Sequence, residues 1–296
     1  MGTGDDTVLT YHYCSNGYLA FTVCLAGLVK GTLHIEFIFF LLFFYCHAAK
    51  LQNILYLCKR IMKFNVIHIN ETDSTNRWVR SNVSTDSYVV VAEYQTAGKG
   101  CGSNSWESER GKNLTFSMLI HPEDIPANDQ FRITEITSVA LCVVLERYLN
   151  MKVEIKWPND IYVGDRKICG MLIENQLQGS KIKSCIIGIG LNVNQREFLS
   201  DAPNPVSLYQ LTGKETDREQ LLNSFLSEFQ TVYTSKTASS DYRERLFRKG
   251  EACLYRDKAT RFTATLKDVL PDGRLLLLDK SGDERLYAFK EVQFII

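Results

Sequence analysis

The sequence has no excess of charge of either sign. Of its 296 residues, 34 are Lys or Arg and 34 are Asp or Glu, so the formal net charge is zero. A balanced chain has no bulk electrostatic attraction to DNA or to an acidic membrane surface. Any anion that the protein binds must therefore be held by the local geometry of a site.

The nine cysteines form no CxxC pair and no Cys/His cluster with the spacing of a zinc site. We interpret them as small, mostly buried thiols in a reducing compartment, and we expect a cytoplasmic protein. Internal repeats and low-complexity tracts are also absent. The composition, 45% apolar and 23% charged, is that of a globular protein with a real core.

The sequence has only a marginal candidate for a membrane-spanning run. The most apolar stretch is FIFFLLFFYC at 37–46, whereas a span needs about 20 apolar residues. Glu36 and His47 interrupt the stretch on its two sides, and the acidic start without a clean cleavage site argues against a signal peptide. We expect residues 1–61 to be an extension outside the functional protein, which would begin at Met62. A membrane anchor is the alternative.

From Met62 onward, the hydrophobic pattern predicts strands mixed with helices. Strands are predicted at 65–69, 88–95, 113–120, 153–163, 168–177 and 184–194. Helices are predicted at 130–150 and 218–233, with a short one after the capping residues at 71–76. From about Gly250, short strands separated by tight turns predict a small β-barrel of roughly fifty residues. We therefore expect an α+β domain over 62–247 and a small barrel domain over 248–296.

Four polar or glycine-rich segments stand out from this pattern. They are DSTN at 73–76, QTAGKGCGSNSW at 95–106, KWPNDIYVGDRKICG at 156–170 and IGIGLNVN at 187–194. Taken singly, each segment is weak evidence for a functional site, because glycine-rich loops are common and Gly-Ile-Gly more often reflects tight sheet packing. Glycine costs about 0.5–1 kcal/mol relative to alanine inside regular structure. The second segment is therefore predicted to be a loop that lies close to another group.

In this order and spacing, the four segments resemble the biotin protein ligase family. The resemblance covers Met62 to the C-terminus, and its most specific part is KWPND followed by Lys167 in RKICG. It implies a mixed sheet packed with helices, as in class II aminoacyl-tRNA synthetases and biotin ligases, followed by an SH3-like barrel. It also implies an enzyme of the biotin–[acetyl-CoA-carboxylase] ligase type. Such enzymes join the biotin carboxylate to the α-phosphate of ATP and then pass biotin to one lysine of a carboxyl carrier protein.

The resemblance also assigns roles to residues. Biotin binding is implied for Ser74, Thr75, Asn76, Gln95, Lys99, Gly100, Cys101, Lys167, Gly170, Gly188 and Gly190. ATP binding is implied for Lys99, Trp106, Lys156 and Asn192. Catalysis is implied for Lys167 and Lys99, with Asp160 orienting Lys167 or helping to hold Mg²⁺. A glycine loop that closes over the adenylate would exclude water until the acceptor lysine arrives.

The glycine loop departs from the family pattern. Family members carry several arginines there, whereas this chain has Lys99, Cys101 and Asn104. Lysine cannot form the bidentate fork of arginine, and a thiol supplies no cation. We therefore expect looser retention of the adenylate, unless Ser103, Asn104 and backbone amides compensate.

Simpler interpretations of these residues stay open. Lys99 would then be a solvated loop lysine, Trp106 a loop anchor, Asp160 a turn carboxylate and Gly188 a packing residue. Two other functions also stay open: a lipoate or octanoate ligase with the same fold, and a non-catalytic or membrane-tethered biotin-binding module. Residues 1–61 contain no basic recognition helix, so we expect no nucleic-acid partner. We expect no membrane partner either, while a homodimer stays open because several family members pair through the sheet.

Overall fold

The computed structural model describes residues 62–102, 104–200 and 204–296, which all fall in the compact unit Arg60–Ile296. The predicted extension at 1–61, with its apolar stretch and four of the nine cysteines, lies outside the described residues. Among the residues that are described, no helix is long and apolar enough to cross a membrane.

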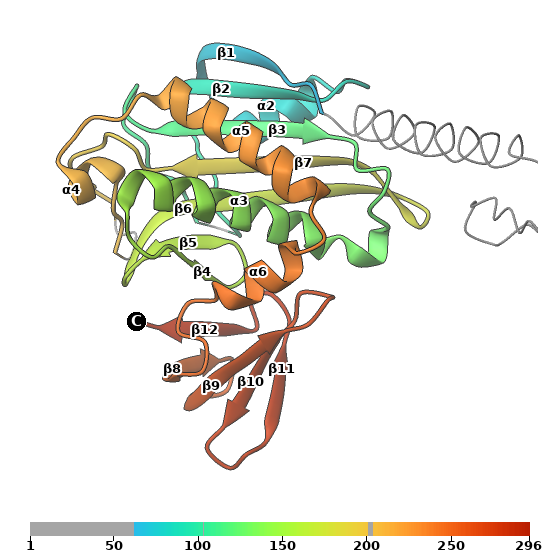
Figure 1. Ribbon diagram of the computed structural model, residues 1–296, viewed down its shortest axis with the longest axis vertical. Coiled ribbons are helices and arrows are strands. Elements are labelled where there is room, and N and C mark those ends of the chain that lie inside the picture. Colours follow the sequence, from blue (N-terminus) through green and yellow to red (C-terminus); the bar gives the residue numbers. More distant parts are fainter. Residues whose placement is uncertain (1–61, 103, 201–203) are drawn as a thin grey trace, which may run out of the picture. The chain divides into compact units, whose positions relative to one another are not determined.

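A mixed seven-stranded sheet forms the centre of the fold (Figure 1). Its strands are β1 (Asn65–Thr72), β2 (Tyr88–Gln95), β3 (Leu114–Ile120), β4 (Glu154–Lys156), β5 (Asp160–Val163), β6 (Arg166–Gln178) and β7 (Lys181–Leu191). They lie in the order β1-β2-β3-β7-β6-β5-β4, with β1 and β2 parallel and the other neighbours antiparallel. The mixed sheet is as predicted, and the consecutive strands from β4 to β7 form an antiparallel meander.

One predicted strand is divided in the structure. The run 153–163 forms β4 and β5, which pair with each other across a turn that contains Pro158. Proline has no N–H to donate to a ladder, and the Trp157–Pro158 peptide bond is cis. The structure therefore shows a hairpin turn where the sequence analysis predicted one continuous strand.

Two long helices cover one face of the sheet, α3 (Phe131–Leu149) and α5 (Arg218–Thr234), as Figure 1 shows. The Asp217 side chain caps α5 by accepting hydrogen bonds from the N–H groups of Glu219 and Gln220. The short helix α2 (Thr75–Ser81) packs against β2, β3 and β7. Three further short helices were not predicted: η1 (Ala127–Asp129), α4 (Leu208–Thr212) and α6 (Ala238–Glu244).

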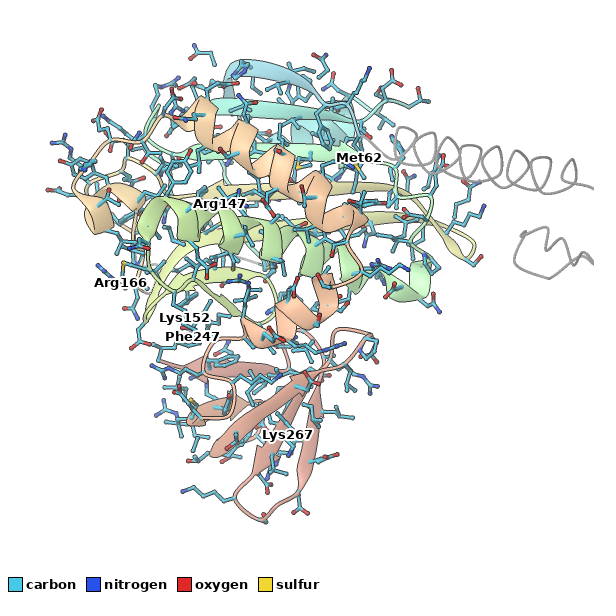
Figure 2. All side chains as sticks on the ribbon, in the orientation of Figure 1. Met62, Arg147, Lys152, Arg166, Phe247 and Lys267 are labelled. Atoms are coloured by element: carbon cyan, nitrogen blue, oxygen red, sulfur yellow. The ribbon has the colours of Figure 1, made fainter. Side chains whose placement is uncertain are left out.

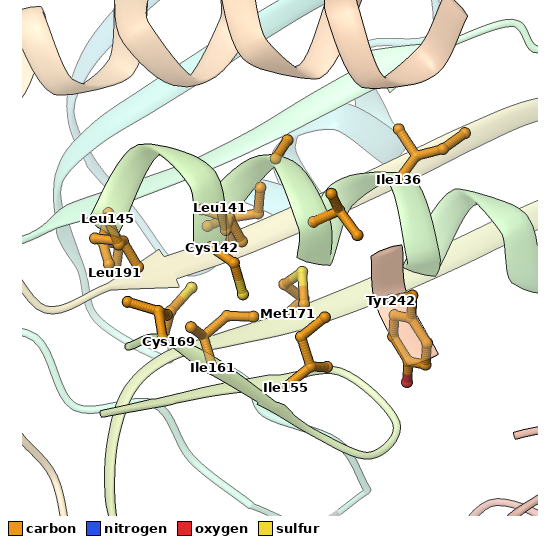
Figure 3. Packing of buried hydrophobic residues seen from close by; sticks show 14 of the residues in the cluster. Ile136, Leu141, Cys142, Leu145, Ile155, Ile161, Cys169, Met171, Leu191 and Tyr242 are labelled. Atoms are coloured by element: carbon orange, nitrogen blue, oxygen red, sulfur yellow. The ribbon is translucent and has the colours of Figure 1, made fainter. Parts of the chain in front are cut away.

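The main core lies between the sheet and the two long helices. Figure 3 shows side chains of α3 facing those of the sheet: Ile136, Leu141, Cys142 and Leu145 opposite Ile155, Ile161, Cys169, Met171 and Leu191. The predicted helix at 218–233 corresponds to α5, and its apolar residues Leu221, Leu222, Phe225, Phe229 and Val232 are buried. Of the five described cysteines, four are buried and all are free thiols, as predicted.

The C-terminal strands form a second, antiparallel sheet in the order β11-β10-β9-β8-β12. The strands are β8 (Ala252–Asp257), β9 (Arg261–Val269), β10 (Leu275–Asp279), β11 (Glu284–Tyr287) and β12 (Val292–Ile295). This sheet fits the predicted SH3-like domain. The described strands β11 and β12 remain its two edges, so the predicted barrel is not closed.

Phe247 connects the two sheets (Figure 2). Its N–H donates to the carbonyl of Ile155 in β4 at 2.9 Å. Its ring lies 5.3 Å from the ring of Tyr162 and 6.4 Å from that of Phe294, measured between centroids. The edge strand β12 of the second sheet therefore lies beside the end of the meander.

Candidate active site

The face of the sheet that turns away from α3 and α5 carries small and polar side chains. In β3, Phe116 packs against α5 through Phe225, so its neighbours Thr115 and Ser117 point to the opposite face. Thr115 pairs with Gly190 of β7, and Ser117 pairs with Gly188. Because paired residues share a face, this side of β3 and β7 forms a shallow floor without large side chains.

The floor continues across the meander to a group of charged residues. Gly190 pairs with Gly170 of β6, Gly170 with Asp160 of β5, and Asp160 with Lys156 of β4. One row of the sheet therefore contains two adjacent glycines, a carboxylate and an ammonium group.

A β-bulge brings Lys167 to this face. Ile161 pairs with Cys169, but the next residue, Tyr162, pairs with Lys167, so β6 contains one extra residue at this point. Regular alternation would have placed Lys167 on the helix-covered face together with the buried Cys169. The bulge redirects the Lys167 side chain toward Gly170.

Lys167 and Asp160 form an ion pair at the end of the glycine floor. The Lys167 Nζ lies 2.7 Å from Asp160 Oδ1, and the two side chains are only 26% and 24% exposed. A Cβ atom added to Gly170 would lie 3.1 Å from that Nζ. The ammonium group is thus fixed directly above the glycine backbone, where a bound carboxylate or phosphate can reach it.

Trp106 covers part of the same floor. A Cβ atom at Gly190 would collide with its indole ring, and one at Gly170 would lie 3.0 Å from it. The Lys167 Nζ lies 5.7 Å from the ring centroid, within the range of a cation–π contact. The indole Nε1 is buried and has no hydrogen-bond partner among the described residues. Trp106, predicted to contact adenine, therefore lies over two glycines that were predicted to contact biotin.

The start of α2 forms the polar end of the site. The backbone N–H and the hydroxyl of Thr75 donate to Gln95 Oε1 at 2.8 and 3.1 Å. The Ser117 hydroxyl lies 2.7 Å from Thr75 Oγ1. Ser74 is buried at the N-cap of α2, but its side chain makes no capping hydrogen bond. These contacts fix Thr75 and Gln95 and leave the Ser74 hydroxyl available to a ligand.

Asn76 lies over Gly188. Its Nδ2 donates to the carbonyl of Leu172 at 3.1 Å and to Glu174 Oε2 at 3.0 Å, and its Oδ1 accepts from Ser117 at 2.6 Å. A Cβ atom at Gly188 would collide with the Asn76 amide. Glycine is therefore required at 188 for this side chain to reach the sheet.

The glycine loop folds back on itself beside the site. Gly100 N–H donates to the Asn104 carbonyl at 2.8 Å, and Trp106 N–H donates to the Gly98 carbonyl at 2.9 Å. These bonds place Trp106 over the floor and leave Lys99 exposed at the loop surface. Lys99 forms no ion pair with any described residue.

Asn159 contacts the loop tip, and Lys290 lies close to it. Asn159 Nδ2, in the turn between β4 and β5, lies 3.5 Å from Cys101 Sγ. Gly102 has a φ of 74°, and a Cβ atom there would lie 3.2 Å from the Nζ of Lys290, next to β12. Ser103, considered above as a compensating donor, lies outside the described residues.

Two predicted nucleotide-binding residues lie at the margins of this site. Burial lowers the pKa of Lys156, and nearby Lys167 acts in the same direction while Asp160 opposes it. The Asn192 Nδ2 donates to the carbonyl of Val206 at 3.1 Å, but its buried Oδ1 has no partner among the described residues. An unpaired buried acceptor is rare in folded proteins, so Asn192 offers an oxygen to a ligand donor.

Most of the predicted site residues thus meet on one face of the sheet. They are Ser74, Thr75, Asn76, Gln95, Trp106, Asp160, Lys167, Gly170, Gly188 and Gly190. Lys99, Gly100 and Cys101 lie on the adjoining loop. The sequence analysis missed Ser117, Asn159 and Glu174. Ser117 had a signal, because it is one of two hydroxyl residues at alternate positions of an otherwise apolar strand.

Two comparisons with known proteins agree with this geometry. The sequence model of the biotin/lipoate A/B protein ligase family matches residues 66–192. The fold is similar to that of a biotin protein ligase from Aquifex aeolicus in complex with biotin and ATP. The TM-score is 0.66 at 27% identity, covering 78% of this chain and 98% of that one. Over residues 66–192, the chain is similar to the biotin/lipoate A/B protein ligase family.

The chain is also similar in sequence to proteins named as biotin ligases. It is 34% identical to the bifunctional ligase/repressor BirA of Bacillus spizizenii over 170 residues. These residues cover 56% of this chain and 51% of that protein. The match thus spans about half of that relative's length. The biotin–[acetyl-CoA-carboxylase] ligase of Paracoccus denitrificans is 25% identical over 232 residues, which cover 73% of this chain and 95% of that protein. The family resemblance and the catalytic fold inferred from the sequence are confirmed.

Proposed function

We propose that the protein activates biotin with ATP as biotinyl-5'-adenylate and transfers the biotinyl group to a lysine of a carboxylase's carrier protein. One observation carries the proposal most directly. The Lys167–Asp160 ion pair lies at the end of a glycine floor, in a fold shared with a biotin protein ligase that binds biotin and ATP.

The polar end of the site suits the ureido ring of biotin. This ring presents a carbonyl oxygen and two N–H groups, so it needs donors and acceptors together. The Ser74 hydroxyl, the Thr75 hydroxyl and the Asn76 amide are gathered at the start of α2, with Gln95 beside them. Biotin bound there would extend its carboxylate along the floor toward Lys167.

In the first step, a carboxylate oxygen of biotin attacks the α-phosphorus of ATP. A new P–O bond forms, the bond between the α-phosphorus and the bridging oxygen breaks, and the electron pair leaves with pyrophosphate. Two anions must approach each other, so a fixed cation is required at the reacting centre. Lys167 supplies it, and Asp160 orients its ammonium group at 2.7 Å.

In the second step, the neutral amine of the carrier lysine attacks the acyl carbon of the adenylate. An amide bond forms, the amine nitrogen releases one proton to solvent, and AMP leaves with the electrons of the broken C–O bond. Between the two steps the mixed anhydride must be protected from water. The glycine loop would close over it with Lys99 near the phosphate, while Asn192 Oδ1 would accept a hydrogen bond from the adenine amino group.

Magnesium would enter this site together with ATP. Mg²⁺ is usually bound through one or two carboxylates and substrate phosphates. Among the described residues no group of three or more His, Cys, Asp or Glu side chains is arranged to hold a metal. Asp160 is the carboxylate in the row of the sheet that contains Lys167, and it would contribute the single protein oxygen.

The proposal is tested by incubating the protein with ATP, biotin and a purified carrier domain, followed by mass spectrometry of the carrier. We expect one added biotinyl group, dependent on ATP, and biotin-dependent release of pyrophosphate. Lipoate offered in place of biotin is the matched control. Modification by lipoate and not by biotin would identify a lipoate ligase, and biotin binding without pyrophosphate release would identify a non-catalytic module.

A further inference from the structure

Glu174 is a charged residue on the site face of the sheet, away from the reacting centre. It lies in β6 two residues beyond Leu172 and four beyond Gly170, so the three side-chain positions share one face. Its Oε2 accepts a hydrogen bond from Asn76 Nδ2 at 3.0 Å, and its Oε1 accepts one from Arg80 Nη2 at 2.5 Å. Arg80 is 61% exposed, and ion pairs in contact with solvent add little to stability. The contact with the buried Asn76 is therefore the one that can affect the site.

The surroundings of the Asn76 amide allow it one orientation. Its two N–H groups meet the carbonyl of Leu172 and the carboxylate of Glu174, which can only accept hydrogen bonds. Its Oδ1 accepts from the Ser117 hydroxyl at 2.6 Å. Turning the amide over would place Oδ1 against two acceptor oxygens. Because the Leu172 carbonyl belongs to the backbone, Glu174 is the side chain that sets this orientation.

A chain of hydrogen bonds continues from Asn76 to the start of the glycine loop. Ser117 has one hydroxyl proton and Asn76 Oδ1 has none, so Ser117 donates to Asn76. The Ser117 Oγ also lies 2.7 Å from Thr75 Oγ1. Thr75 in turn donates to Gln95 Oε1 through its N–H and its hydroxyl. The Gln95 oxygen therefore faces Thr75, and its Nε2 forms no hydrogen bond with any described residue.

The free Gln95 Nε2 is the end of this chain that a ligand can reach. A Cβ atom at Gly98 would lie 3.2 Å from this nitrogen, so the donor lies at the base of the glycine loop. The carbonyl oxygen of a ureido ring is an acceptor that would use it. Hydrogen bonds in a chain polarise one another and are worth more together than singly. Fixing Asn76 at one end therefore strengthens the donor at the other.

We propose that Glu174 is a positioning residue for biotin. It holds the Asn76 amide, and through it the hydrogen bonds that Ser117, Thr75 and Gln95 make at the polar end of the site. This inference rests on the proposed function for the identity of the ligand. It also explains why a carboxylate lies beside an uncharged pocket, since an ionised carboxylate is a strong acceptor that cannot donate.

A double-mutant cycle tests whether Glu174 acts through Asn76. Biotin is titrated by calorimetry into the full chain carrying Glu174→Ala, Asn76→Ala or both, and KM values for biotin and ATP are measured by pyrophosphate release. Glu228→Ala is the matched control. It removes a carboxylate whose partner, Arg147, is 60% exposed on the helix-covered side of the sheet (Figure 2). Circular dichroism and thermal unfolding confirm that each variant folds, and Glu174→Gln enters the cycle if Glu174→Ala does not fold.

We expect Glu174→Ala to weaken biotin binding and to raise the KM for biotin about tenfold, with the KM for ATP unchanged. Asn76→Ala should weaken binding at least as much. Adding Glu174→Ala to Asn76→Ala should have no further effect, because Glu174 then has nothing to position. Glu174→Gln keeps an acceptor oxygen and should bind biotin more tightly than Glu174→Ala, while Glu228→Ala should match the wild type.

Wild-type biotin affinity in Glu174→Ala would overturn the inference and leave the proposed function intact if the protein biotinylates its carrier. Additive losses in the double variant would also overturn it, because Glu174 would then act independently of Asn76. Equal weakening by Glu228→Ala would do the same by showing a general effect of lost ion pairs. Biotin binding that depends on Glu174, in a protein that transfers no biotin, would support the inference and contradict the proposed function.

Discussion

The two faces of the seven-stranded sheet are built from the same strands, but their side chains have different roles. The face under α3 and α5 carries large apolar residues such as Phe116 and Ile189. On the opposite face of the same two strands, Thr115 pairs with Gly190 and Ser117 pairs with Gly188. One face stabilises the fold through buried area, while the other uses small residues to admit polar side chains and a ligand.

The largest expected effect on stability comes from the helix-covered face. Phe116 is fully buried, and its ring centroid lies 5.5 Å from that of Phe225. Phe116→Ala should lower the free energy of unfolding by about 3–5 kcal/mol, because it leaves a cavity between the sheet and α5. Denaturant unfolding measures this change, and the KM for biotin of the folded variant should match that of the wild type.

The adjacent residue on the opposite face is the matched comparison. Ser117→Ala removes the hydrogen bonds to Thr75 and Asn76 and should lower stability by only about 1 kcal/mol. It should, however, raise the KM for biotin. If Phe116→Ala altered the KM as strongly as Ser117→Ala, the division of labour between the two faces would be wrong.

The largest expected effect on chemistry comes from Lys167→Ala. Removal of a fixed group that stabilises developing charge typically costs about 10²–10³-fold in rate. Biotin-dependent pyrophosphate release should fall by this amount, while thermal unfolding stays close to that of the wild type because the side chain is part of no apolar cluster. Full activity in this variant would remove Lys167 from the mechanism. Lys167→Arg keeps the charge and should retain more activity than alanine.

An intermediate effect is expected from adding one methyl group to the glycine floor. Gly188→Ala places a Cβ against the Asn76 amide, which must then leave Ser117 and Leu172. We expect the KM for biotin to rise about tenfold or more, which corresponds to about 1.4 kcal/mol. Calorimetric titration of biotin checks this. Gly179→Ala in the turn between β6 and β7 is the control. Its φ of 61° strains an alanine there, so stability should fall, but no atom beyond its chain neighbours lies within 4 Å of the added methyl group and biotin binding should not change. Unchanged biotin binding in Gly188→Ala would show that the floor is not the biotin site.

The helix-covered face was largely predictable from the sequence. Apolar residues at helical spacing identify the buried side of α5, and the apolar run of β3 identifies a buried strand. These signals are local, because each residue's burial follows from its position within its own element. The positions of the chemistry-bearing segments could also be inferred, but only because their combined order resembles a known family.

The arrangement of the site face could not be derived in the same way. The direction of Lys167 depends on a bulge between β5 and β6, which exists only in the paired strands. The position of Trp106 over Gly190 joins segments that are distant in sequence. The contacts of Phe247 with Tyr162 and Phe294 require the docking of a second sheet. Each of these three features depends on how separate elements pack together. The residue pattern within a single strand contains no information about such packing.

The smallest expected effect lies on the loop beside the site face. Lys99 is exposed and forms no ion pair with any described residue. Contributions of exposed charges are usually below about 1 kcal/mol, so Lys99→Ala should lower adenylation less than about fivefold. It should also speed the loss of biotinyl-adenylate, because the loop retains fewer cations with which to close over the phosphate. Trapping of labelled adenylate on the protein measures both rates. Lys99→Arg introduces a bidentate fork and should slow the loss of biotinyl-adenylate relative to the wild type. Identical rates in all three proteins would instead make Lys99 a solvated surface residue. Retention of the adenylate would then depend on the loop backbone.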